Sequence, residues 1–308
     1  MTESYDQINI FCIKTVHRDL AGPVQDEFDH NEFYMDTHVI ELKNQLDQMF
    51  KRNIRFFCLT NESTIQFPDI NLMDVSSYDL WGWWNKMLLF KKPFTQKGLN
   101  IYIDLDTIIQ REITDIVQYA VRDKLSCIYG YWKPIDWERQ AYEASDFNPF
   151  YKHATIMNSS FLMWFDDELE YIWHQFANDM DKHMVVLRGN DEYINLFHKD
   201  ILNMLPRGIF YSYFYGAEEG SEFFPKDKDQ FVKRPEYYIR MLNGMGKNKV
   251  RTHALFAETK EPVPPNYKTV SVIQREKRAV AEQLEIPVDA KGDVIESSYN
   301  KVGVKIST

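Results

Sequence analysis

Short strand-like runs alternate with helix-like segments through the first two thirds of the chain. Runs rich in β-branched and aromatic residues lie at 8–15, 54–60, 99–104, 127–131 and 161–165. Segments with helical apolar spacing lie at 35–51, 81–90, 114–124 and 166–182. This alternation predicts an α/β fold, with a mostly parallel sheet flanked by helices. Such sheets bind their ligands at the carboxyl ends of the strands.

The distribution of charge changes late in the chain. Residues 226–251 hold eight Lys and Arg against three Asp and Glu, whereas the whole chain has a net charge of −10. A Pro-rich break at 262–265 and a predicted helix at 274–284 follow. We therefore expect a catalytic domain over residues 1–225 and a C-terminal extension over residues 226–308. The extension would complete the active site or the acceptor surface.

Several classes of protein are disfavoured by the composition. No apolar run approaches the ~20 residues of a membrane span, and the N-terminus lacks the basic and apolar regions of a signal peptide. Three widely spaced cysteines, at positions 12, 58 and 127, fit neither a disulfide framework nor a zinc site. They are expected to be buried in strands of a cytoplasmic protein. The acidic balance also argues against binding of nucleic acid by the whole surface.

The most informative motif is an Asp-x-Asp that follows an apolar strand. In Ile101-Tyr102-Ile103-Asp104-Leu105-Asp106 the two carboxylates lie two residues apart, and side chains at i and i+2 share one side of an extended strand. Two carboxylates at that place fit a hard cation such as Mg²⁺ or Mn²⁺, completed by water and phosphate oxygens. The alternative is a strand-to-loop turn capped by two aspartates.

Two other enzyme classes compete for this motif. Haloacid-dehalogenase-type phosphatases place a Thr or Val four residues after the first Asp, but here Ile108 stands there and Thr107 comes one residue too early. Sugar nucleotidyltransferases open with a Gly-rich loop after the first strand, which residues 13–18 lack. A binding module without catalytic activity is a third alternative.

Four segments together resemble one family of enzymes. Trp83-Trp84-Asn85-Lys86, the Asp-x-Asp, Met157-Asn158-Ser159-Ser160 and Gly189-Asn190-Asp191 occur in the order seen in glycosyltransferases with the GT-A fold. The chain resembles the glycogenin-like and lipopolysaccharide-galactosyltransferase-like members and their bacteriophage-borne relatives, over about residues 8–205. The resemblance implies transfer of a sugar from a nucleotide-sugar donor, with a UDP-sugar expected.

The resemblance implies a metal site for Mn²⁺ or Mg²⁺. Asp104 and Asp106 would hold the ion on the donor diphosphate. Relatives often add a late histidine in a His-x-x-Gly-x-x-Lys-Pro pattern. His253 and Lys260 are the candidates here, His253 as a metal ligand and Lys260 as a donor-binding residue, although the glycine is missing and the spacing differs.

The resemblance also assigns residues to the donor and to catalysis. Lys86 would reach the donor phosphates; its alternative is a solvated charge on a helix. Asn158 and Ser159 would form a turn that lines the sugar pocket. Asp191 would lie near the anomeric carbon as the catalytic carboxylate, and it also suits the N-cap of a helix. The pattern leans towards the retaining relatives.

The acceptor is less constrained. Because phage-borne relatives include enzymes that modify DNA, and because residues 226–251 are basic, one expected acceptor is a hydroxymethylated or already glycosylated base in DNA. A saccharide, lipid or protein acceptor is the alternative. Aromatic side chains at 129–132 and 211–215 could stack on sugars or bases, or pack against the sheet.

Overall fold

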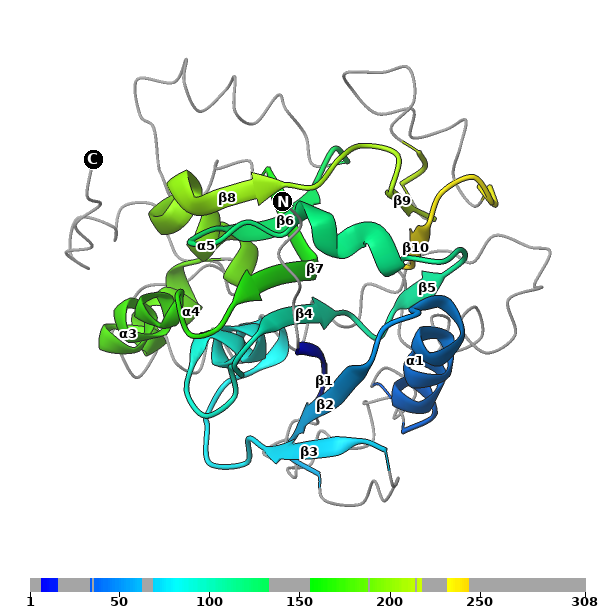
Figure 1. The fold of residues 1–308 in the computed structure, drawn as a ribbon. Helices are drawn as coiled ribbons and strands as arrows, with labels where there is room; N and C mark the ends of the chain where they lie inside the picture. Colours follow the sequence, from blue (N-terminus) through cyan, green and yellow to red (C-terminus); the bar gives the residue numbers. More distant parts are fainter. Residues whose placement is uncertain are drawn as a thin grey trace, which may run out of the picture.

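The computed structural model describes residues 7–15, 34, 36–62, 69–132, 156–187, 189–213, 215–217 and 232–243. These residues form a central sheet with helices on both faces (Figure 1). The expected α/β fold is therefore confirmed. The predicted helix at 274–284 and most of the basic segment lie outside the described residues.

The central sheet has seven strands in the order β3-β2-β1-β4-β7-β6-β8. Six of them run in the same direction, and β7 is antiparallel to both of its neighbours. The chain leaves β1 towards β2 and β3 on one side and places β4 on the other, so the strand order reverses between β1 and β4. The strands are β1 (Ile8–Lys14), β2 (Ile54–Thr60), β3 (Asn71–Asp74), β4 (Leu99–Ile103), β6 (Leu125–Tyr129), β7 (Met157–Phe165) and β8 (Leu202–Met204).

A second sheet of three strands begins just after the Asp-x-Asp. Strand β10 (Ile239–Met241) lies between β5 (Thr107–Ile109), to which it is antiparallel, and β9 (Phe210–Ser212), to which it is parallel. Residues 239–241, from the expected C-terminal extension, thus pair with strands of the expected catalytic domain. The division at residue 225 stays a prediction.

Each face of the central sheet packs against its own group of helices. Ile10 and Cys12 of β1 face the cluster formed with α1 (Asp36–Met49) and the 3₁₀ helix η4 (Thr114–Tyr119). Phe11 and Ile13, on the opposite side of the same strand, face the other helices. These are the 3₁₀ helix η3 (Gly82–Phe90) with α3 (Glu170–Asn178), α4 (Met180–Val186) and α5 (Asn190–His198); a short 3₁₀ turn, η5 (Lys199–Ile201), follows.

The predicted elements differ from the structure in several places. The helices predicted at 81–90 and 114–124 are 3₁₀ helices, the second shorter than expected. The long helix predicted at 166–182 is two helices that meet at Asp179 and begin later, because residues 166–169 form a turn in which Asp166 has a left-handed φ of 49°. Strand β3, at the edge of the sheet, was not predicted, and neither were the short strands β5, β8, β9 and β10.

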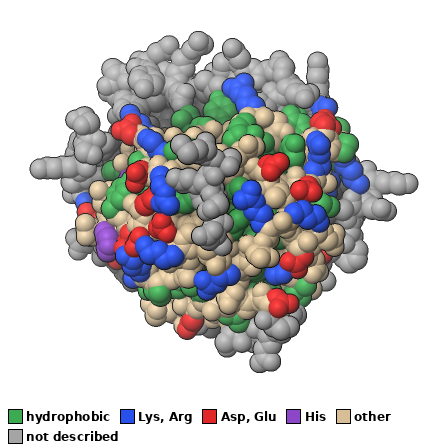
Figure 2. Space-filling view, in the orientation of Figure 1, with side chains coloured by type: hydrophobic (Ala, Val, Ile, Leu, Met, Phe, Trp, Pro, Cys, Tyr) green, Lys and Arg blue, Asp and Glu red, His purple; other side chains and the backbone are tan. Residues whose placement is uncertain are grey.

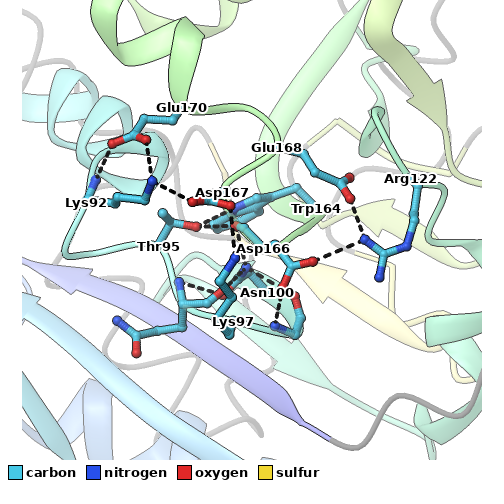
Figure 3. A network of polar contacts seen from close by, with 12 residues as sticks. Lys92, Thr95, Lys97, Asn100, Arg122, Trp164, Asp166, Asp167, Glu168 and Glu170 are labelled. Carbon is cyan, nitrogen blue, oxygen red and sulfur yellow. Dashed lines mark hydrogen bonds and ion pairs between the residues drawn. The ribbon is translucent and has the colours of Figure 1, made fainter.

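A polar network holds this turn at the amino end of β4. Asp166 Oδ1 accepts a hydrogen bond of 2.8 Å from the backbone N–H of Gly98, and Asp166 also pairs with Arg122. Lys92 pairs with Asp167 and Glu170 from the other side (Figure 3). The network therefore stabilises the amino end of β4, opposite the carboxyl end that carries the Asp-x-Asp.

The surface and the cysteines agree with a globular protein. Acidic and basic side chains are intermixed over the face drawn in Figure 2. Cys12, Cys58 and Cys127 are buried cysteines in β1, β2 and β6, as predicted. Among the described helices, none has the length and apolar character needed to cross a bilayer.

Candidate active site

The two aspartates follow the central strand of the sheet. Strand β4 ends at Ile103, the backbone N–H of Asp104 donates to the carbonyl of Ser160 across 2.9 Å, and a turn at residues 105–106 precedes β5. The strand was expected to stay extended through Asp106 and so place both carboxylates on one side, but it ends before Asp104, and that expectation is wrong. Both carboxylates nevertheless influence the same group, the hydroxyl of Tyr34. Burial raises the pKa of Tyr34 well above its usual value, and the charges of Asp106 and Asp104 raise it further.

Lys86 reaches the first aspartate from η3. Its Nζ lies 2.8 Å from Asp104 Oδ1 and 2.9 Å from Oδ2, and it donates to Ser159 Oγ across 3.1 Å. Lys86 is 7% exposed, so the alternative of a solvated helix charge is wrong. Burying an ammonium is unfavourable unless it is paired, and Asp104 supplies that partner. The role of Lys86 towards a donor stays a prediction.

Tyr102 also contacts Asp104. Its hydroxyl donates to Oδ1 of Asp104, and the ring lies 5.2 Å from Lys86 Nζ. Burial, together with the charge of Asp104, raises the pKa of Tyr102 well above its usual value. The phenol therefore stays protonated and acts as a permanent donor to the carboxylate.

The antiparallel strand β7 brings Asn158 and Ser159 to the same edge. A turn was expected here, but both residues lie at the start of β7, where the register with β6 is irregular between Cys127 and Ile128. Asn158 Oδ1 accepts from the backbone N–H of Ser160 across 3.0 Å. The first residues of an antiparallel strand lie beside the last residues of its neighbour, which places Ser159 next to Asp104.

Asp191 joins this group from the first turn of α5. Its Oδ1 accepts a hydrogen bond of 3.2 Å from the backbone N–H of Ser159, and Asn190 Nδ2 donates to Ser159 Oγ across 2.9 Å. Gly189 occupies the N-cap, so the N-cap assignment of Asp191 is wrong; the carboxylate turns towards β7 instead. An acidic side chain in a first helical turn is favourable with the helix dipole.

The site thus unites four predicted residues and two that were not predicted. Asp104, Lys86, Ser159 and Asp191 are linked by direct contacts. Tyr102 and Asn190 complete the links. Tyr102 stands in β4 two residues before Asp104, and this i, i+2 spacing is the sequence feature that could have predicted its contact with Asp104.

The predicted late residues, His253 and Lys260, lie outside the described residues. Among the late residues that the structure describes, those of β10 reach the motif. Met241 pairs with Thr107, and Leu242 N donates to Asp106 O across 2.8 Å. The His-x-x-Gly-x-x-Lys spacing recurs at Met241, Gly244 and Lys247, with methionine in the first place.

The donor atoms suit a hard divalent cation. Carboxylate oxygens of Asp104 and Asp106 are the ligands that Mg²⁺ and Mn²⁺ prefer. Among the residues that the structure describes, no third His, Cys, Asp or Glu joins them. Two protein ligands leave the remaining positions to water and substrate oxygens, as is common for Mg²⁺.

One solved structure supports the fold. The chain resembles the galactosyltransferase LgtC in complex with donor and acceptor sugar analogs, with a TM-score of 0.50 and 11% identity over 85% of this chain and 99% of that one. For an active-site mutant of LgtC the TM-score is 0.49 and the identity is 12%, over 82% of this chain and 97% of that one. For the glycosyltransferase GlyE of Streptococcus pneumoniae TIGR4 the TM-score is 0.48 and the identity is 13%, over 90% of this chain and 63% of that one.

The chain therefore has a GT-A fold, the α/β fold of LgtC. At 11% identity the likeness establishes the fold alone. No protein-family model matches the sequence, and no curated protein matches it significantly.

Proposed function

We propose that the protein is a metal-dependent glycosyltransferase, which moves a sugar from a nucleotide-diphosphate sugar to an acceptor hydroxyl. A UDP-sugar is the first donor to test. The observation that supports this most is the linked group of Lys86, Asp104, Ser159 and Asp191 at the carboxyl edge of a GT-A sheet.

The donor would lie across β1 and β4. Ligands of open α/β sheets bind where the strand order reverses, and this reversal lies beside Asp104. Asp104 and Asp106 would hold Mg²⁺ or Mn²⁺, with His253 as the predicted third ligand. The ion would neutralise charge on the departing diphosphate.

Lys86 would then serve two partners. It pairs with Asp104 in the structure, and it would share its positive charge with the diphosphate as the glycosyl–phosphate bond breaks. Asn158 and Ser159 would line the sugar pocket, and the predicted donor contact of Lys260 stays with them as a proposal. A preformed ion pair keeps the ammonium in place, so little rearrangement is needed when charge develops.

Asp191 would act beside the anomeric carbon. Its bond from Ser159 N holds the carboxylate against β7, at the residue whose hydroxyl accepts from Lys86. In an inverting reaction it would accept the proton of the acceptor hydroxyl. In a retaining reaction it would stabilise positive charge on the sugar.

For the acceptor, a modified DNA base remains one proposal, and a saccharide, lipid or protein is its alternative. The basic segment that suggested DNA is described only over residues 232–243. There Lys233 is exposed, but Arg240 is 3% exposed and packs against Tyr213, so Arg240 is unsuited to follow a phosphate backbone.

The proposal is tested by incubation with Mn²⁺ or Mg²⁺ and a panel of nucleotide sugars, with release of nucleoside diphosphate as the readout. We expect metal-dependent release by the wild type, and a loss of about 100-fold or more in Asp104→Asn and Asp106→Asn. Asp115→Asn, an exposed carboxylate in η4, is the matched control.

Three results would contradict the proposal. Release that is unchanged in both aspartate variants would refute the metal site. Release of inorganic phosphate from phosphomonoesters would point to the phosphohydrolase, and nucleotide binding without turnover would point to a binding module.

A further inference from the structure

Trp83 is a large aromatic side chain that the fold leaves unusually exposed. It belongs to η3, in which the residues from Trp84 to Phe90 are buried, yet Trp83 itself is 46% exposed. A single exposed apolar residue is ordinary on a protein surface. An indole is a costly group to leave in water, however, so its neighbours decide whether the exposure has a use.

The helix geometry places Trp83 on the same side as Lys86. Residues three apart on a 3₁₀ helix eclipse one another, and the rise is about 2 Å per residue. The two side chains therefore leave the same face of η3, roughly 6 Å apart along its axis. Since Lys86 reaches Asp104 and Ser159, the indole lies at the outer side of the same group of residues.

A second contact fixes Trp83 against α5. A methyl group on Gly189 would lie 3.4 Å from Cε3 of Trp83 and 3.9 Å from its Cβ, so the indole packs against the backbone at Gly189. Gly189 directly precedes Asn190 and Asp191, whose side chains contact Ser159. The contacts run from Trp83 through Gly189, Asn190 and Ser159 and return to η3 at Lys86.

We propose that Trp83 is a stacking platform for the glycosyl acceptor, and that this acceptor is a saccharide. Pyranose rings carry C–H groups on one face and hydroxyls around the edge. An exposed indole suits the C–H face, and polar groups such as Asp191 suit the hydroxyls. The inference rests on the proposed transferase function and adds the acceptor class.

The charges around the site favour a sugar over a polyanion. Among the described residues of this group, the cationic side chain is that of Lys86, which Asp104 already pairs, and Asp191 adds a carboxylate beside Ser159. A nucleic acid brings phosphates that need free cations near the stacked base. A neutral saccharide meets no such repulsion.

The donor sugar is a less suitable occupant. Lys86, Ser159, Asn190 and Asp191 already present polar groups for it, next to the aspartates that would hold the diphosphate. Trp83 lies at the outer end of that series, where the next sugar would be.

The experiment measures saccharide binding without relying on turnover. Saturation-transfer NMR with a panel of methyl pyranosides and disaccharides compares the wild type with Trp83→Ala and Trp83→Phe. We expect at least one saccharide to bind the wild type, about tenfold weaker binding to Trp83→Ala, and partial recovery in Trp83→Phe. Tyr238→Ala, an exposed tyrosine at the second sheet, is the control and should bind normally.

Kinetics separate acceptor from donor. With an active donor, the KM for the acceptor should rise about tenfold in Trp83→Ala, while the KM for the donor stays within about twofold. The inference is overturned if no saccharide binds, if binding is equal in all variants, or if the donor KM rises instead. Trp83-dependent binding of modified DNA would overturn it in favour of a base. A wild type that binds saccharide but releases no nucleotide refutes the transferase alone.

Discussion

Lys86 Nζ lies 2.8 Å from Asp104 Oδ1, although η3 carries the lysine and the loop after β4 carries the aspartate. Removing the ammonium in Lys86→Met would leave a carboxylate that is 16% exposed without this counter-ion. We expect a loss of about 2 kcal/mol in the free energy of unfolding and a fall of about 100-fold in kcat/KM for nucleotide release. Urea unfolding and the release assay measure the two effects.

A double variant tells the two effects apart. Lys86→Met with Asp104→Asn removes both charges, so stability should recover by more than half, while activity stays low. Lys86→Arg keeps the charge with a different shape and should be stable but impaired. Full activity in Lys86→Met would contradict a role for the ammonium at the donor.

The Asp191→Asn variant removes the negative charge of this side chain while keeping its size and its position. An amide oxygen can accept the bond from Ser159 N as the carboxylate does, so we expect the free energy of unfolding to change by less than about 0.5 kcal/mol. The rate of sugar transfer should fall by about 100-fold or more, because the negative charge beside the anomeric carbon is lost. We expect the variant and the wild type to have similar melting temperatures but very different kcat values. A kcat near that of the wild type would exclude Asp191 as the catalytic carboxylate.

The sequence predicted those parts of the fold that local patterns determine. The three strands β1, β2 and β4 each carry an apolar run, and the predicted ends lie within one residue of the observed ones. Strand β3 carries Asn71 and Asp74, and its residues are mostly exposed. An edge strand with one neighbour buries little, so it leaves no apolar pattern to detect.

Long-range contacts explain what sequence patterns missed at the site. Asp104 was predicted from its strand, but its link to Ser159 depends on the antiparallel course of β7, which spacing along the chain does not encode. The turn of Asp191 towards Ser159 likewise depends on where α5 packs. Sequence patterns indicate which residues carry the chemistry, whereas the topology determines which of them meet.

Two buried histidines make stability depend on pH. Burial lowers the pKa of His183 and of His198 to about 4, against 6.5 ordinarily. Because the folded state favours the neutral ring, this stability is complete above pH 6.5 and is lost as pH falls towards 4. Each histidine could contribute about 3 kcal/mol to the loss. We expect unfolding in urea at lower concentrations at pH 4.5 than at pH 7.

A variant assigns this pH dependence to one site. His183 packs among Phe176, Tyr193 and Phe197, so His183→Phe should reduce the fall in stability between pH 7 and pH 4.5. His174→Gln, at an exposed position in α3, is the control and should leave the fall unchanged. Identical pH profiles for wild type and His183→Phe would show that other groups cause the dependence.

Gly98 and Gly208 share a left-handed backbone but differ in their surroundings. Their φ values are 98° and 84°, and a Cβ on Gly98 would lie 2.4 Å from the carbonyl oxygen of Gln7, whereas a Cβ on Gly208 would meet nothing within 4 Å. That carbonyl accepts the bond from Leu99 N that starts the pairing of β1 with β4. Gly208→Ala should therefore cost about 1 kcal/mol of unfolding free energy from backbone strain, and Gly98→Ala about 3 kcal/mol or more. Equal losses in urea unfolding would mean that the close approach of Gln7 adds nothing to the requirement for glycine at position 98.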